Sequence, residues 1–219
     1  MFRKILLMLV IGSFMVGTAF AGIKEVREAH ANKDYTTCIS EADKVLADES
    51  ASTLDKAKAQ RYFGYCYYKQ RDYVKAIPAF QKEIADYPEE RKLYAINQRY
   101  IGYCYYYQRD YVKAIPAFQK VIADENASIR DKASAQYFIG RCYKGMGKTA
   151  EAQESFLKML TDYPEQTEHV KVAIDKVNFA SMTNEEVQTL LNTILRATPA
   201  TEKNAEFLGR IKSELEKFK

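Results

Sequence analysis

Tyrosine and arginine are the residues best placed to do chemistry in this sequence, because the groups that usually carry catalysis are scarce. The chain has two histidines, His30 and His169, and neither lies in a motif with a nucleophile or a metal-ligand partner. It has no glycine-rich phosphate loop and no HExxH zinc motif. Its many carboxylates form no pair that can be assigned to acid–base catalysis. We therefore expect two surface histidines and a protein that is not an enzyme and holds no cofactor and no metal.

Tyrosine, arginine and lysine recur at a regular spacing in the middle of the chain. Thirteen of the 17 tyrosines fall between Tyr62 and Tyr111, and the chain has no Trp. At about 100° per residue, three sets of these side chains each share one side of a helix. The sets are Arg61, Tyr65, Tyr68 and Lys69; then Arg99, Tyr103, Tyr106 and Tyr107; and then Tyr137, Arg141 and Lys144.

An internal repeat positions these sets. Residues 60–86 recur at 98–124, and the 27 aligned positions differ at three: Phe63/Ile101, Lys69/Tyr107 and Glu83/Val121. A further step of 38 residues reaches a diverged copy at 136–160. Self-similarity with a period of this size indicates stacked units, because one unit cannot bury its own apolar face.

Each unit is predicted to consist of two helices. Apolar residues recur at helical spacing in both, with Ser52 and Asp72 placed to cap the first and second helix of one unit. Pro78, repeated as Pro116, falls inside the second helix and removes a backbone donor there. Only 9 Gly and 5 Pro occur in 219 residues, and 47% are hydrophobic, which excludes collagen-like, low-complexity and turn-rich β classes. The fold class is therefore all-α.

The units resemble the tetratricopeptide repeat. The spacing of the family's Gly, Tyr, Ala, Phe and Pro is matched by Gly64, Tyr67, Ala76, Phe80 and Pro88. The next two copies match in the same register, except that the first of them lacks the proline. Glutamine replaces the family tryptophan in every copy. The resemblance implies an α-solenoid of antiparallel helix pairs with about three clear repeats, degenerate units at both ends and a capping helix. Its longer units ending in Tyr-Pro are similar to those of periplasmic envelope-assembly and Tol–Pal-associated proteins.

The register predicts the domain boundaries. The solenoid covers 22–199, and a charged amphipathic stretch at 200–219 is predicted to be the C-terminal capping helix. Helical stretches are expected near 167–180 and 184–197, the second opened by a capping box at 183–186. The expected units lie near 22–50, 52–88, 90–126, 128–164 and 166–199.

Residues 1–21 are predicted to be a signal peptide. A basic start at 3–4, an apolar run at 5–16 and a small-x-small pattern at 19–21 have the required order. The run is shorter than the about 20 apolar residues of a spanning helix, although an uncleaved anchor is an alternative. No cysteine lies near the cleavage site, which argues against a lipoprotein. We expect a soluble, exported protein in a bacterial periplasm, with no stable membrane span after cleavage.

The cysteines are predicted to be free thiols. Cys66, Cys104 and Cys142 each follow a repeat glycine by two residues, where the family usually has a small, buried alanine, and Cys38 takes another small-residue site. Equivalent positions in neighbouring units lie about 10 Å apart, beyond the ~7 Å reach of a disulfide. Cys38 with Cys66 is the only pair that could meet.

The side of the first helix that carries the three sets lines a concave, peptide-binding groove in the proteins that the chain resembles. Tyrosine and arginine are enriched at binding hot spots, so we predict a protein- or peptide-binding scaffold that uses this groove. Its cations suit an acidic segment. However, Tyr65 and Tyr103 stand where the chaperone-binding carboxylate clamp has its groove asparagine.

Two alternatives stay open at this stage. The tyrosines could pack between units rather than face a ligand. Rings beside cations could also bind a cell-wall glycan, which would make the protein a glycan-binding or envelope-assembly accessory module. Nucleic acid is not expected, because the net charge of +4 is small and the chain is predicted to be exported.

Overall fold

The computed structural model describes residues 22–89 and 93–218, and the predicted signal peptide lies outside these ranges. The described residues form helices and no strand. Short 3₁₀ turns occur near the C-terminal end, at Ile174–Lys176, Phe179–Ser181 and Glu202–Asn204. The α-helices are α1 (Ile23–Ala31), α2 (Tyr35–Ala47), α3 (Thr53–Lys69), α4 (Tyr73–Asp86), α5 (Tyr94–Tyr107), α6 (Tyr111–Ala123), α7 (Ile129–Gly145), α8 (Thr149–Asp162), α9 (Thr167–Ala173), α10 (Asn184–Ala197) and α11 (Ala205–Glu216).

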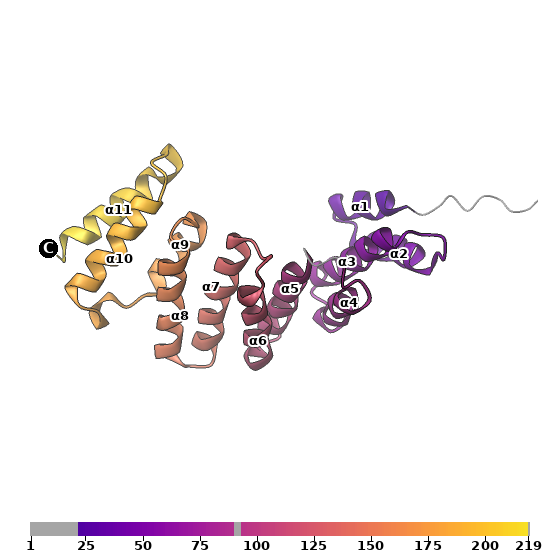
Figure 1. The fold of residues 1–219 in the computed structure, drawn as a ribbon, viewed down its shortest axis with the longest axis horizontal. Coiled ribbons are helices and arrows are strands. Elements are labelled where there is room, and N and C mark those ends of the chain that lie inside the picture. Colours follow the sequence, from indigo (N-terminus) through magenta and orange to yellow (C-terminus); the bar gives the residue numbers. More distant parts are fainter. Residues whose placement is uncertain (1–21, 90–92, 219) are drawn as a thin grey trace, which may run out of the picture.

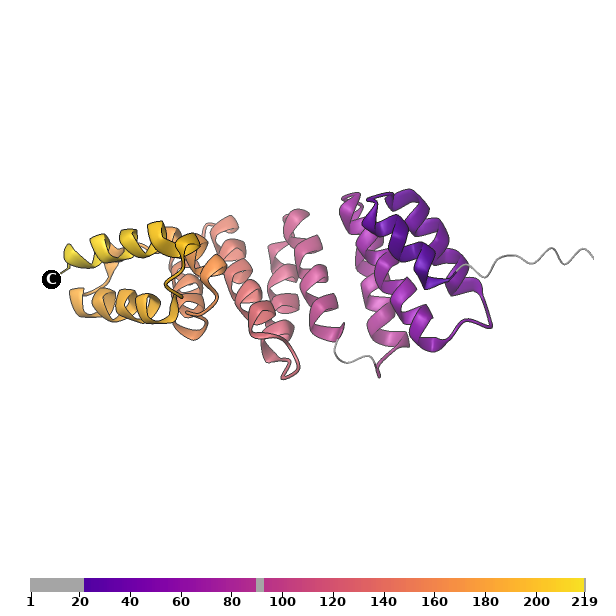
Figure 2. The same cartoon turned by 90° about the horizontal axis from the view of Figure 1, so that it is seen from above.

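The helices stack in antiparallel pairs along an arc (Figure 1). The first helix of each pair lies on the inside of the arc, as α3, α5 and α7 do, and the second lies on the outside, as α4, α6 and α8 do. Seen from above, the pairs follow one another in a single row (Figure 2). The predicted all-α solenoid is confirmed, and we call the surface of α3, α5 and α7 on the inside of the arc the inner face.

Local sequence signals define where the helices begin. Asp72 and Asp110 accept hydrogen bonds from the third backbone N–H of α4 and α6, at 3.2 Å in both cases. Ser52 caps α3 in the same way, as predicted, and Ser128 caps α7. The residue before each aspartate adopts a left-handed conformation, at Lys33, Arg71 and Arg109, and in the fourth pair the equivalent residue is Gly147. This repeated turn gives successive pairs the same geometry.

The repeat glycines allow the two helices of a pair to approach closely. A Cβ added at Gly64 would lie 2.8 Å from the ring of Phe80, and one at Gly102 would lie 2.6 Å from the ring of Phe118. Both phenylalanines are fully buried. The glutamine that replaces the family tryptophan is also buried, and Gln60 Nε2 donates to the carbonyl of Ala79 at 3.1 Å. In the pairs α3–α4, α5–α6 and α7–α8, the two helices are therefore held by one packed ring and, where this bond forms, by one buried polar contact.

The C-terminal end differs from the expected register. The helix predicted near 167–180 ends at Ala173 and gives way to 3₁₀ turns. The second predicted helix is present as α10, and Thr183 with Glu186 forms its capping box, as predicted. α11 packs on α10 and buries Phe207 and Ile211 in the same core, which gives the last unit its cap.

The expectation of four free thiols is wrong, because Cys38 and Cys66 form a disulfide. Cys38 lies on α2, the second helix of the first pair, and Cys66 lies on α3, the first helix of the next pair. These helices pack directly, so the two Cα atoms are 6.6 Å apart, within bridging reach. Cys104 and Cys142 are buried and free, as predicted.

Pro78 does not break its helix, since α4 continues through it.

Candidate functional site: the inner face

All three predicted sets of site residues lie on first helices, on α3, α5 and α7. Their exposure differs sharply. Lys69, Tyr107 and Lys144 are exposed, and Tyr107 shows 48% of its surface. The other eight are only partly exposed: Arg61, Tyr65, Tyr68, Arg99, Tyr103, Tyr106, Tyr137 and Arg141. The rings therefore form the wall of the inner face rather than a fully open row.

One aromatic ring from each repeat inserts between rings of the preceding repeat. The Tyr100 ring packs 4.5 Å from Tyr65, 5.1 Å from Tyr68 and 5.5 Å from Phe80, measured between centroids. Phe138 repeats this arrangement one unit later, in contacts with Tyr103, Tyr106 and Phe118. These edge-on and offset contacts are the geometry that aromatic pairs favour. The rings thus join three successive repeats into one continuous layer.

The ring layer continues toward both ends of the solenoid. His30 lies 5.2 Å from Tyr62 and 6.2 Å from Tyr65, so it is a partly buried member of the layer rather than the expected surface histidine. On α7, Tyr137 packs on Phe138 and Phe156. His169 is also partly buried.

The inserting rings are not among the residues predicted from the sequence. Tyr62, Tyr100 and Phe138 occupy one repeat position, and the position is aromatic in every copy. That regularity was visible in the alignment of the repeats, but the position borders the apolar stripe of the first helix and was not assigned a role. The alternative in which tyrosines pack between units therefore describes Tyr65, Tyr68, Tyr103 and Tyr106.

Arg99 is neutralised within the chain. Its guanidinium lies 2.6 Å from a carboxylate oxygen of Asp131 at the start of α7, and it stands 5.5 Å from the centre of the Tyr100 ring. Arg61 occupies the same position one repeat earlier. The residue of the next repeat that corresponds to Asp131 is Leu93 there, so Arg61 has no equivalent carboxylate. Within the described part of the chain, Arg99 therefore has an ion pair and Arg61 has none, although both occupy the same repeat position.

Four cations of the predicted sets form no ion pair with the residues that the structure describes: Arg61, Lys69, Arg141 and Lys144. Arg141 is held over aromatic faces instead, 4.8 Å from the centre of the Tyr106 ring and 5.0 Å from that of Phe138. Such a cation–π position orients the guanidinium without neutralising it. The inner face therefore offers positive charge on a rigid aromatic wall.

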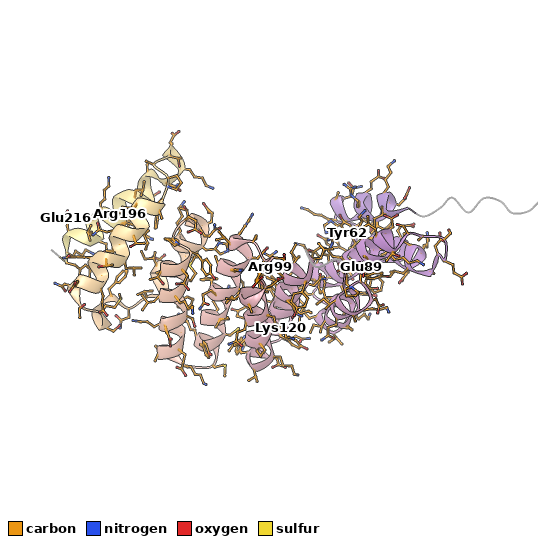
Figure 3. All side chains as sticks on the ribbon, viewed as in Figure 1. Tyr62, Glu89, Arg99, Lys120, Arg196 and Glu216 are labelled. Atoms are coloured by element: carbon orange, nitrogen blue, oxygen red, sulfur yellow. A yellow bond between two sulfur atoms is a disulfide. The ribbon has the colours of Figure 1, made fainter. Side chains whose placement is uncertain are left out.

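Tyr107 is the most accessible ring of the predicted sets. It stacks on Tyr73 of the preceding pair, with centroids 5.7 Å apart and planes 15° apart, and it also contacts Tyr68 and Tyr106. In Figure 3, Tyr62 and Arg99 lie toward the inside of the arc and Lys120 toward the outside. Position 107 is one of the three differences between the two nearly identical copies, where the earlier copy has Lys69.

Comparison with known sequences decides the family. Sequence profiles described as tetratricopeptide repeat match residues 24–91, and also 98–125 and 134–165. The chain belongs to the tetratricopeptide-repeat family. Membership supports a role as a protein-interaction scaffold. No curated protein sequence matches the chain.

Several solved structures share the fold. A crystal structure of the MamA protein aligns with a TM-score of 0.56 and 19% identity over 84% of this chain and 92% of that chain. Another MamA crystal structure gives 0.54 and 16% over 88% and 91%. A putative kinesin light chain from Podosopora anserina with nearly identical TPR-like repeats gives 0.53 and 12% over 90% of both chains. At these identities the likeness concerns the fold alone.

Within the described part of the chain, the repeats show no group of three or more His, Cys, Asp or Glu side chains that could hold a metal ion. No helix in that part is long and apolar enough to cross a bilayer. Burial raises the pKa of the free thiols of Cys104 and Cys142 to about 12, so both thiols stay protonated at neutral pH.

The ring layer should be visible in an alkaline titration. Burial, above all, raises the pKa of Tyr65, Tyr68 and Tyr103 above the usual value of about 10. The unfolded chain then loses these protons more readily than the folded chain does. The three raised pKa values therefore contribute a stability of the folded state that is present below about pH 10 and is lost as the pH rises further. We expect tyrosinate absorbance to rise in two stages, the second together with loss of helical circular dichroism. A single stage near pH 10 that includes all 17 tyrosines with the helices intact would contradict the layer.

Proposed function

We propose that this tetratricopeptide-repeat protein is a non-enzymatic scaffold that binds an extended or helical protein segment along its inner face. The observation that carries the proposal is the set of cations without ion-pair partners among the described residues, placed beside the ring layer. A scaffold surface of this kind presents its binding groups on rigid helices, so little conformational entropy is lost when a partner binds.

The chemistry favours an acidic segment. A carboxylate could contact the cations that have no ion pair with the described residues, Arg61, Lys69, Arg141 and Lys144, without displacing a partner there. Arg99, in contrast, would have to release Asp131. Arginine held over a ring presents its planar fork at a fixed angle, which suits bidentate carboxylate recognition. Tyr107 adds an accessible apolar surface with a polar tip beside them.

A glycan is the weaker candidate. A sugar ring stacks on an open aromatic face, and Tyr107 is the single tyrosine of the predicted sets with more than about a third of its surface exposed. The other rings are covered by neighbouring repeats. We therefore expect the purified protein to stay in solution when peptidoglycan is sedimented, and robust co-sedimentation would favour the glycan instead.

We also propose that the protein works in an oxidising compartment, the bacterial periplasm. The disulfide between Cys38 and Cys66 supports this location, because structural disulfides persist in exported proteins and are rare in the cytosol. The signal-peptide pattern at residues 1–21 supports it independently from the sequence.

Replacing two of these cations tests the binding proposal. We expect the Arg141→Ala/Lys144→Ala variant to bind its partner from periplasmic extract at least about a hundredfold more weakly, since each of the two charged contacts contributes about 1.5–3 kcal/mol. Lys158→Ala is the matched control, because Lys158 is an exposed cation on the outer helix α8. Unchanged recovery by the double variant, with its circular dichroism intact, or an equal loss with the control, would contradict binding at the inner face.

A further inference from the structure

Two cations and one exposed ring lie in a row toward the C-terminal ends of α3, α5 and α7. The ammonium of Lys69 lies 6.0 Å from the centre of the Tyr68 ring, which contacts the Tyr107 ring at 6.3 Å. Tyr107 contacts Tyr106 at 5.4 Å, and the Arg141 guanidinium lies 4.8 Å from the centre of the Tyr106 ring. Each cation is thus two ring contacts away from Tyr107. We call Lys69, Tyr107 and Arg141 the Tyr107 row.

The charges of the Tyr107 row are available to a partner. Lys69 and Arg141 have no ion pair within the described part of the chain, and the exposed Lys144 adds a cation one turn after Arg141. Tyr107 is the last residue of the 14-residue helix α5, about 20 Å from its first residue, and the undescribed residues 90–92 precede that first residue. A partner that matches the row carries acidic groups on both sides of an apolar one.

The tyrosine hydroxyls beside the row favour an extended partner over a helical one. The hydroxyls of Tyr68, Tyr106 and Tyr107 form no hydrogen bond with a described residue, whereas that of Tyr103 is paired with Ser134 at 2.7 Å. A helix pairs its own backbone groups, but a polyproline II segment has no internal hydrogen bonds and can pair with these hydroxyls. Such segments also dock on aromatic surfaces at a low cost in conformational entropy.

The repeat geometry sets the spacing that such a segment needs. The helices α3, α5 and α7 contact one another in that order, and packed helices lie about 8–10 Å apart. A polyproline II segment rises about 3.1 Å per residue with three residues per turn, so residues i, i+3 and i+6 share one side at intervals of about 9 Å. One step along the row therefore corresponds to three residues of the segment.

We propose that the Tyr107 row binds a polyproline II segment in which an apolar residue has an acidic residue three positions before it and another three positions after it. The apolar side chain packs on the Tyr107 ring, one carboxylate reaches Lys69, and the other reaches Arg141 and Lys144. This inference rests on the proposed function and adds to it the conformation and the residue pattern of the partner.

Fluorescence anisotropy of labelled peptides with the full-length chain tests this pattern. The matched peptide is Glu-Pro-Pro-Leu-Pro-Pro-Glu, and its isomer Pro-Pro-Glu-Leu-Glu-Pro-Pro has the same composition and charge. We expect the isomer to bind at least about tenfold more weakly, because its acids cannot reach both cations, and the glutamine version of the matched peptide at least about a hundredfold more weakly. An alanine-based helix with Glu, Leu and Glu seven positions apart is the helical probe. Equal or tighter binding of the isomer or of the helical probe would overturn the proposal.

Substitutions assign the peptide to the Tyr107 row. Tyr107→Lys introduces the residue type that the earlier copy carries as Lys69, so the fold should tolerate it. It should shift the preference at least about tenfold from the matched peptide toward Glu-Pro-Pro-Glu-Pro-Pro-Glu. Lys69→Gln should weaken the matched peptide at least about tenfold, and the outer-helix control Lys158→Ala should leave it unchanged. An unshifted preference in the first variant, or unweakened binding in the second, would contradict the assignment.

The partner in periplasmic extract separates failure of the pattern from failure of the proposed function. If the peptides show no dependence on spacing while Arg141→Ala/Lys144→Ala still weakens binding of the extracted partner, the residue pattern is wrong and binding at the inner face stands. If binding of the extracted partner is also unaffected, both the pattern and the proposed function are wrong.

Discussion

Replacing Phe80 with alanine is expected to lower the free energy of unfolding by about 3–5 kcal/mol, as a core truncation of a large ring. Phe80 is fully buried and fills the space left by Gly64, where an added Cβ would lie 2.8 Å from its ring. It also supports the layer, because Tyr65 and Tyr100 both pack on it at 5.5 Å. The loss should be measured by urea unfolding followed by far-ultraviolet circular dichroism.

The control for this variant lies on the same helix. Val74 is 74% exposed on α4, so Val74→Ala should change the free energy of unfolding by less than about 0.5 kcal/mol. A loss below about 1 kcal/mol for Phe80→Ala would mean that the ring is not in the core and that the register of the repeats is wrong. Probes in α4 and α8 should be followed separately, because a solenoid can unfold in parts.

Removing the disulfide is expected to destabilise the N-terminal helix pairs by about 2–4 kcal/mol, since a cross-link chiefly restricts the unfolded chain. Cys38→Ala is the informative change, because Ala76, Ala114 and Ala152 occupy the equivalent positions in the other repeats. The substitution therefore removes the bond between α2 and α3 with little change in packing. In thermal unfolding of the oxidised proteins, Cys38→Ala should be less stable than the wild-type protein. In the presence of dithiothreitol the two proteins should have almost the same stability.

Cys104 supplies the comparison for the disulfide variant. It is a buried free thiol at the repeat position of Cys66, so the effect of Cys104→Ala should not depend on the reductant. The unfolded, unreduced wild-type protein should release two titratable thiols. Four thiols, or a difference in stability between the wild-type protein and Cys38→Ala that is the same with and without reductant, would contradict the bond.

Much of the fold could be predicted because its signals are local and repeated. The offset of 38 residues, the serine and aspartate caps and the Gly–Phe pairing each depend on residues close in sequence or related by one repeat step. Gly64 and Phe80 could be paired from the family spacing alone. The capping box at Thr183 and Glu186 was likewise predicted from four consecutive residues, and the structure forms it.

The remaining features depend on contacts between repeats that the sequence pattern does not specify. The register suggests a constant spacing between units, but Cys38 and Cys66 lie on adjacent helices of successive pairs and come within 6.6 Å. Arg61 and Arg99 share a repeat position, yet among the described residues Arg99 forms an ion pair with an aspartate of the next unit and Arg61 forms none. The packing of Tyr100 could not be predicted, because the sequence does not show which neighbouring helix its side of α5 faces. The sequence therefore predicted which side of the helices the site residues share, but not how far each side chain is exposed.

The ring layer gives the inner face a specific physical character. Tyr65, Tyr68, Tyr103 and Tyr106 are held by contacts on both sides, so they add rigidity rather than a flexible binding surface. Rigid support of this kind reduces the entropy lost when exposed groups bind a partner. In the proposed function, the contacts with that partner would be made by Tyr107 and by the cations without ion pairs among the described residues.

Site-specific photo-crosslinking in intact cells tests the binding surface most directly. A photoreactive phenylalanine analogue would replace Tyr107 on the inner face and, as the matched control, the exposed Gln119 on the outer helix α6. We predict a discrete crosslinked protein from position 107 that is lost in the Arg141→Ala/Lys144→Ala background and is absent from position 119. A partner crosslinked from position 119 alone, or from position 107 regardless of those cations, would contradict binding of a protein segment at the inner face.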